Sequence, residues 1–118
     1  MDIMELQKIN KTHRMSRIVV HGETIYLCGQ VCKDSTKGIK EQTATTLEKI
    51  EELLASVGSD KSKLIMVQIF VKDMADFAGM NEVWDAWVDQ ENPPARACVE
   101  AAMARPDLLV EMVVTAAK

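Results

Sequence analysis

Short apolar runs with a two-residue period open the chain and predict strands. Residues 17–21 and 24–28 are rich in β-branched side chains and are separated by a tight turn at 21–23, which predicts a β-hairpin. Residues 4–10 alternate more weakly between polar and apolar side chains and predict an edge strand. The polar loop that follows leads into a segment with a different period.

Two longer segments have the period of a helix. Residues 38–57 place apolar side chains three and four positions apart, which predicts an amphipathic helix ended by Gly58 as its C-terminal cap. Residues 73–90 repeat this pattern, with Asp73 or Asp76 as the N-cap. The two prolines that follow prevent this second helix from continuing.

Residues 64–71 lie between the two helices and are almost entirely apolar, with only Gln68 as an interruption. A half-exposed strand alternates, so this run predicts a strand that is buried on both faces. One layer of helices covers only one face of a sheet. A second copy of the chain is the simplest cover for the other face, and the pattern therefore indicates an oligomer.

The last 27 residues, 92–118, predict two strands of a hairpin joined by a turn at 105–107. Each strand carries one charged side chain among apolar neighbours, Arg96 in the first and Glu111 in the second. Burying a lone charge is costly, so each needs water, a partner or a ligand. Which face the two charges share depends on the register of the hairpin, which the sequence leaves open.

The order of predicted elements is β-β-β-α-β-α-β-β, which indicates an α+β fold with two helices on one face of a mixed sheet. A length of 118 residues argues for a single domain covering residues 1–118. Hydrophobic residues at 47% and charged residues at 27% are typical of a globular protein rather than a disordered one.

The net charge and the cysteine content indicate which binding partners and which cellular location to expect. The net charge is -4 and no long basic block occurs, which argues against binding to nucleic acid or to an anionic membrane surface. The start of the chain lacks the apolar core of a signal peptide, and no run reaches the roughly 20 apolar residues of a membrane span. Three cysteines without a metal-binding spacing predict free thiols, a cytoplasmic location and no metal.

Arg96 is the first candidate for chemistry, because a guanidinium can hold a carboxylate through two parallel hydrogen bonds. It follows a pair of prolines, where the backbone is stiff. We therefore interpret the region as a site for a small carboxylate, with a salt bridge at the strand end as the alternative. Cys98 lies two residues further on and points to the same face, where it either lines the site or acts as a small buried hydrophobe.

Three other residues have both a functional and a structural interpretation. Glu111 could place a water molecule and exchange protons, or it could be an exposed residue of an edge strand. Gly29 could let a ligand approach backbone N–H groups closely, or it could be a turn glycine. Asn81 could reach a neighbouring loop, or it could be a hydrogen-bonded interface residue.

The sequence around these residues resembles the RidA (YjgF) family of reactive-intermediate deaminases. The resemblance rests on Pro-Ala-Arg-Ala-Cys-Val-Glu at 94–100, Val-Glu-Met at 110–112 and Cys-Gly-Gln at 28–30, and it covers essentially the whole chain. The Trp-Asp-Ala-Trp segment at 84–87 is more similar to the YoaB-like branch of the family.

This resemblance implies a chorismate-mutase-like fold, assembled as a homotrimer whose sheets form a central barrel with clefts between subunits. Arg96 would hold the carboxylate of a 2-imino or 2-enamino acid, and Glu111 would help to place the hydrolytic water. The products would be a 2-keto acid and ammonia, formed without a metal or an organic cofactor. The other residues expected to bind the substrate are Gly29, Cys28, Cys98 and Asn81.

The chain departs from the family pattern at three places. Residues 14–16 read Arg-Met-Ser where the family often has an aromatic residue after Gly-Pro, Cys28 replaces a serine or threonine, and Val-Cys at 31–32 replaces Ile-Pro. These differences concern the ligand more than the fold. Two functions therefore stay open, an imine deaminase and a non-catalytic trimeric sensor or scavenger of small carboxylates or ketoacids. A ribonuclease or translation inhibitor, functions attached to some family members, is the least favoured.

Overall fold

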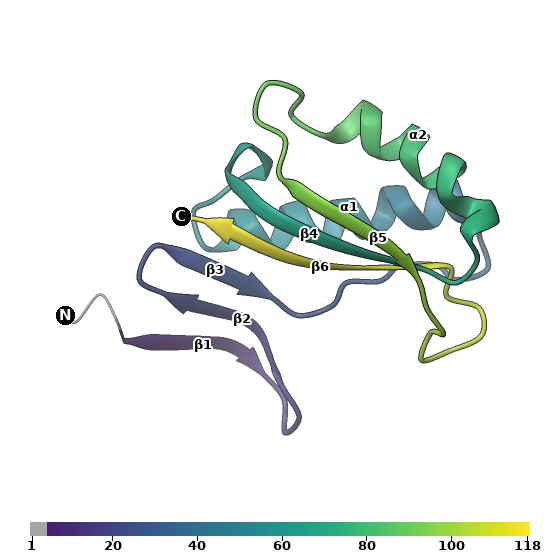
Figure 1. The fold of residues 1–118 in the computed structure, drawn as a ribbon. Coiled ribbons are helices and arrows are strands. Elements are labelled where there is room, and N and C mark those ends of the chain that lie inside the picture. Colours follow the sequence, from purple (N-terminus) through teal and green to yellow (C-terminus); the bar gives the residue numbers. More distant parts are fainter. Residues whose placement is uncertain (1–4) are drawn as a thin grey trace.

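The computed structural model describes residues 5–118 as one six-stranded sheet with two helices packed on one of its faces (Figure 1). The order of strands across the sheet is β1-β2-β3-β6-β4-β5, and only β4 and β5 run parallel. The strands are β1 (Leu6–Lys11), β2 (Ser16–His21), β3 (Thr24–Leu27), β4 (Leu64–Val71), β5 (Ala95–Glu100) and β6 (Val110–Ala117). The predicted α+β fold and its order of elements are confirmed. Met4, in the predicted edge strand, lies outside the described residues.

The predicted hairpin of the last two strands is wrong, because β4 lies between them. β6 pairs antiparallel with β4 on one side, and β5 pairs parallel with β4 on the other. Parallel neighbours need a crossover connection, and the helix between β4 and β5 provides it. The most apolar strand thus gains a strand on each side, while residues 101–109 carry the chain past it.

The first helix, α1 (Ile39–Ser56), matches the prediction. Gly58 follows it with a φ of +79°, and the Ser59 amide donates to the Leu54 carbonyl at 2.9 Å, as a glycine cap requires. The second helix, α2 (Phe77–Trp87), is shorter than predicted. A 3-10 turn, η2 (Met74–Asp76), precedes it, and the Asp73 side chain accepts a hydrogen bond from the Ala75 amide at 2.8 Å.

The core lies between the sheet and the helices. Every second residue of β6 is buried, and these side chains form one cluster with apolar residues of α1 and α2. The central members of the cluster are Ile50, Leu54, Val67, Ile69, Met80, Trp84, Met112 and Val114. Within residues 5–118 neither helix is long and apolar enough to cross a membrane.

The opposite side of the sheet has no covering layer within the described chain. This side, called the open face below, carries side chains that alternate with the buried ones: Val19, Tyr26, Gln68, Phe70, Val99, Glu111, Val113 and Thr115. Tyr26 is 46% exposed and Val99 is 50% exposed. The predicted burial of β4 on both faces requires a second copy of the chain over the open face, and it stays a prediction.

Candidate functional site

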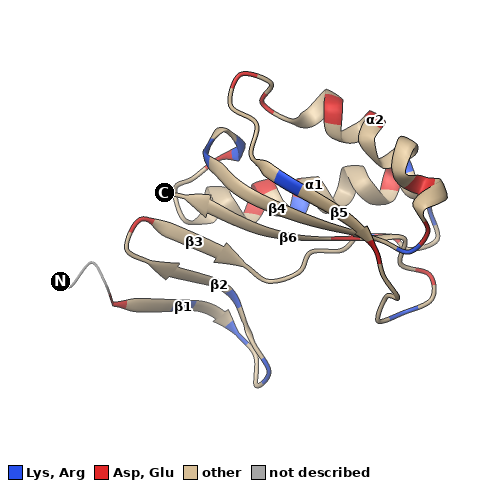
Figure 2. Cartoon of the chain, in the orientation of Figure 1, with Lys and Arg blue, Asp and Glu red and all other residues tan. Residues whose placement is uncertain are grey.

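Arg96 is held on the helix side of the sheet by α2. It is the only basic residue of β5 (Figure 2). Its Nη1 donates to Oδ1 of Asn81 at 2.7 Å, and its guanidinium carbon lies 5.3 Å from the centroid of the Trp84 ring. Asn81 and Trp84 are three residues apart in a helix and so share one face. A hydrogen bond and a cation–π contact together fix the orientation of the guanidinium.

The guanidinium of Arg96 still has donors to offer. It carries five N–H groups, and Asn81 accepts from Nη1. None of the ion pairs formed among residues 5–118 includes Arg96, so the alternative of a strand-end salt bridge is not realised in that part of the chain. The side chain is half-buried and can therefore be reached by a small anion.

Cys98 lies beside Arg96 on β5 and packs against the core cluster. Burial raises the pKa of the Cys98 thiol, and the nearby Arg96 charge offsets only part of that effect. The thiol therefore keeps its proton at neutral pH. A protonated, half-buried thiol is suited to lining a site rather than to attacking a substrate.

A second group of candidate residues lies where β3 ends. The backbone of Gln30 exchanges two hydrogen bonds with Met112, with N–O distances of 2.8 and 3.0 Å. This pairing places Gly29 against Glu111, and a Cβ atom at Gly29 would lie 2.7 Å from Glu111 Oε2. The absence of a side chain at this position lets the carboxylate lie directly against the strand end.

Gln30 and Cys28 give this strand end its shape. The Gln30 side chain is buried, and its Nε2 donates to the Cys28 carbonyl at 3.1 Å and lies 3.3 Å from the Cys28 Sγ. The same strand end borders a cavity of about 180 Å³. The sequence analysis assigned no role to Gln30 or Trp84. Each lies in a motif that the resemblance had marked, Gln30 at 28–30 and Trp84 at 84–87, and that position was the signal that could have identified it.

A single chain does not bring Arg96 and Glu111 together. Arg96 is paired with Val67, which is buried under the helices, whereas Glu111 is paired with Phe70 on the open face. Arg96, Asn81 and Cys98 therefore form one group on the helix side. Gly29 and Glu111 form another, and Glu111 also borders a second cavity, of about 320 Å³, with Phe70 and residues 101–104.

The described part of the chain holds no group of three His, Cys, Asp or Glu side chains arranged to bind a metal ion. What the arrangement offers is a fixed guanidinium with free donors, and a carboxylate against an open backbone. The first can hold an acid group, and the second can orient water and move protons.

Comparisons with known proteins all match this chain to the same family. The family model described as Endoribonuclease L-PSP matches residues 5–118. A RutC family protein of Haemophilus influenzae is 42% identical over 114 residues, which are 96% of this chain and 98% of that protein. The RutC family protein YoaB of Escherichia coli K12 is 39% identical, over 97% of this chain and 99% of its own length.

A solved structure gives the same result. A member of the YjgF protein family from Neisseria meningitidis superimposes with a TM-score of 0.96 at 43% identity, covering 99% of this chain and 98% of that one. Membership of this group supports a role in processing small molecules. The chain belongs to the YjgF/RidA family, in which the RutC proteins are its relatives, and it has that family's chorismate-mutase-like fold.

Proposed function

We propose that the protein hydrolyses reactive 2-imino and 2-enamino acids to 2-keto acids and ammonia, in clefts between the subunits of a homotrimer. The observation that carries the proposal is the guanidinium of Arg96, held by Asn81 and Trp84 with donors left free. A substrate carboxylate would accept two parallel hydrogen bonds from it. Family membership supports the coarser statement that the protein processes small molecules.

The position of Glu111 supports a site that is completed by a neighbouring subunit. Arg96 and Glu111 lie on opposite faces of one sheet, so one chain cannot present both to one small substrate. The open face carries exposed apolar side chains such as Tyr26 and Val99, and another copy of the chain would bury them. In such an assembly Arg96 of one subunit would face Gly29 and Glu111 of the next.

The chemistry requires only orientation, water and proton transfer. Glu111 takes a proton from water, whose oxygen adds to the imine carbon while the electrons of the C=N double bond move to nitrogen, which then receives that proton from Glu111. Glu111 next accepts the hydroxyl proton of the carbinolamine and passes it to the amino group, so that the C=O bond of the keto acid forms, the C–N bond breaks and ammonia leaves. Arg96 contributes by holding the carboxylate so that the imine carbon faces the water.

The alternative is a non-catalytic trimeric module that binds small carboxylates or ketoacids. The observation that favours it is Met15, which lines the cavity beside Cys28 where the resemblance leads one to expect an aromatic residue. Cleavage of RNA is least favoured. The net charge is -4 and aromatic residues make up 4%, whereas single-stranded RNA is usually bound by basic grooves with stacking aromatic side chains.

The test is release of ammonia from freshly generated 2-iminobutanoate, compared with the spontaneous rate. Arg96→Lys keeps the charge but removes the planar fork, and we expect kcat/KM to fall about 10- to 100-fold, as for loss of roughly 1.5–3 kcal/mol of charge-assisted hydrogen bonding. Arg105→Lys, at an exposed arginine, is the matched control and should retain activity. If the wild type binds 2-oxobutanoate but does not hydrolyse 2-iminobutanoate, the proposed enzyme activity is refuted and the binding module is favoured.

A further inference from the structure

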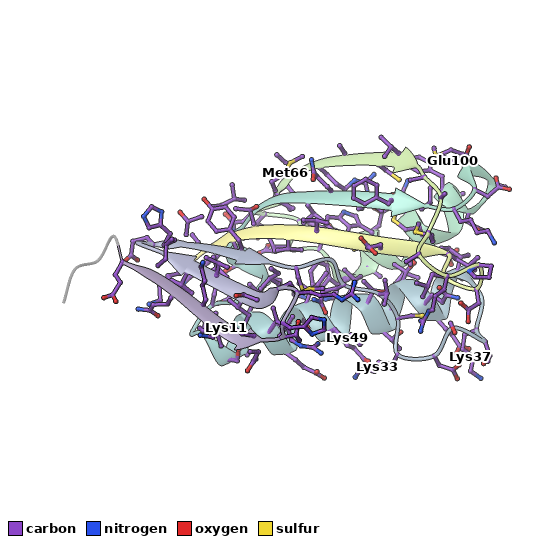
Figure 3. The ribbon with its side chains drawn as sticks, turned by 90° about the horizontal axis from the view of Figure 1, so that it is seen from below. Lys11, Lys33, Lys37, Lys49, Met66 and Glu100 are labelled. Atoms are coloured by element: carbon purple, nitrogen blue, oxygen red, sulfur yellow. The ribbon has the colours of Figure 1, made fainter. Side chains whose placement is uncertain are left out.

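The cavity at the end of β3 is lined by two cationic side chains. Arg17 reaches it from β2 and Lys49 from α1, and Gly29 and Gln30 form its border. In the view of Figure 3, Lys49 lies between Lys11, at the end of β1, and Lys37. Two positive charges at one small cavity are notable in a chain whose net charge is -4.

Neither of these two charges is paired with an acid in the part of the chain that the structure describes. Lys33 contacts Glu48 at 3.2 Å, and Lys40 pairs with Glu82 at 2.8 Å, but no ion pair among residues 5–118 includes Arg17 or Lys49. The Nζ of Lys49 donates to the Cys32 carbonyl at 3.3 Å, which keeps it at the cavity. The cavity is therefore a place where an anion would be favoured.

The cavity adjoins the position proposed for the reaction. Gly29 lines it and also lies against the Glu111 carboxylate. A substrate whose imine carbon is placed beside Glu111 could therefore extend its side chain into the cavity. A volume of about 180 Å³ exceeds the roughly 30 Å³ that one water molecule occupies in the liquid, so a short side chain with an acid group has room.

We propose that Arg17, assisted by Lys49, forms a second anion subsite that selects 2-imino dicarboxylates, substrates whose side chain ends in a carboxylate. The inference rests on the proposed function and names its substrate class. The guanidinium fork of Arg17 matches a carboxylate, and Lys49 adds a second positive charge. The apolar part of Met15, also at the cavity, would cover the methylene groups between the two acids.

The first test compares binding of two ketoacids of equal length, 2-oxoglutarate and 2-oxopentanoate, by calorimetry. We expect the wild type to bind 2-oxoglutarate at least about 10-fold more tightly, the effect of one added charge-assisted contact. Arg17→Gln should remove this preference and leave the affinity for 2-oxopentanoate unchanged, whereas Lys49→Gln should reduce it in part. The matched control is Arg14→Gln, at an exposed arginine that does not line the cavity, and it should keep the preference.

Equal affinity of the wild type for the two ketoacids, or an equal loss for both in Arg17→Gln, overturns the subsite. A second arm measures hydrolysis of the imines generated from glutamate and norvaline, which separates this inference from the proposed function. Turnover of both imines at the same kcat/KM would support the proposed hydrolase activity and refute the Arg17 subsite. Binding of 2-oxoglutarate that depends on Arg17, without turnover of either imine, would support the subsite and refute the proposed hydrolase activity.

Discussion

Single side chains in this site are held by contacts that can be altered one at a time. Arg96 is oriented by Asn81 and Trp84, whereas the Glu111 carboxylate is positioned by the lack of a side chain at Gly29. The two residues should therefore respond to different substitutions. Changes near Arg96 should affect substrate binding, and changes near Glu111 should affect the rate of the chemical step.

Gly29→Ala should lower activity with little effect on folding. The new Cβ would lie 2.7 Å from Glu111 Oε2, and the end of a flexible side chain moves more readily than backbone. Gly29 is not among the described residues with positive φ, so alanine fits the backbone. We expect kcat for imine hydrolysis to fall about 10-fold, the scale of losing part of a general acid–base contribution, while ketoacid affinity changes less.

Gly38→Ala is the control for this substitution, because nothing lies within 4 Å of the Cβ it would introduce. It should leave kcat unchanged. A Gly29→Ala protein with wild-type kcat would show that Glu111 need not lie against the strand end.

At the scale of elements, a buried glutamine joins three parts of the chain. Gln42 of α1 is fully buried, and its Nε2 donates to the Lys37 and Asp107 carbonyls, each at 3.0 Å. Its Oε1 accepts from the Leu109 amide at 2.9 Å. One side chain thus ties the loop before α1 to the connection that leads into β6. Because this connection leads directly into β6, the hydrogen bonds of Gln42 also fix the start of the strand that carries Glu111.

Gln42→Met, a change of similar volume, should destabilise the fold by about 2–4 kcal/mol. Each buried group left without a partner costs about 1–3 kcal/mol, and several lose their partner together. Urea unfolding at fixed protein concentration measures the free energy of unfolding. Gln90→Met is the control, because Gln90 is exposed and bonds only to the Asp85 carbonyl among the described residues. Equal free energies of unfolding for the two variants would contradict the stabilising role of the Gln42 hydrogen bonds.

At the scale of the whole molecule, the sheet has one packed face and one open face. The open face exposes Tyr26 and Val99 within a single chain, which is an unusual surface for a protein that remains a monomer. The separation of Arg96 from Glu111 across the sheet leads to the same expectation. Assembly would bury the apolar residues and complete the site in one step.

Val99→Lys should therefore convert the proposed trimer into monomers. A charged side chain at a half-exposed position costs little in the single chain but would be buried at the interface. Sedimentation velocity measures the change in mass, circular dichroism should stay that of the wild type, and imine hydrolysis should fall to the spontaneous rate. Met74→Lys, at an exposed apolar residue of η2, should remain assembled. A monomeric wild-type protein would refute the expectation.

The sequence alone determined those features whose cause is local. The 3.6-residue period of α1, the cap at Gly58, the strand-forming runs and the family motif around Arg96 can all be read from neighbouring residues. The α+β class followed from their order. Arg96 and Glu111 were also recognisable as candidates, because each is a charge within an apolar strand.

Only the tertiary structure decided which strands are neighbours and which face each charge occupies. A hairpin was the simplest interpretation of β5 and β6, but β4 separates them because placing the most apolar strand between two others outweighs keeping consecutive strands adjacent. That choice turned Arg96 toward Asn81 and Trp84 and put Glu111 on the open face. Such pairings join residues far apart in the chain, and their energies depend on the packing of the whole sheet, which no local pattern encodes.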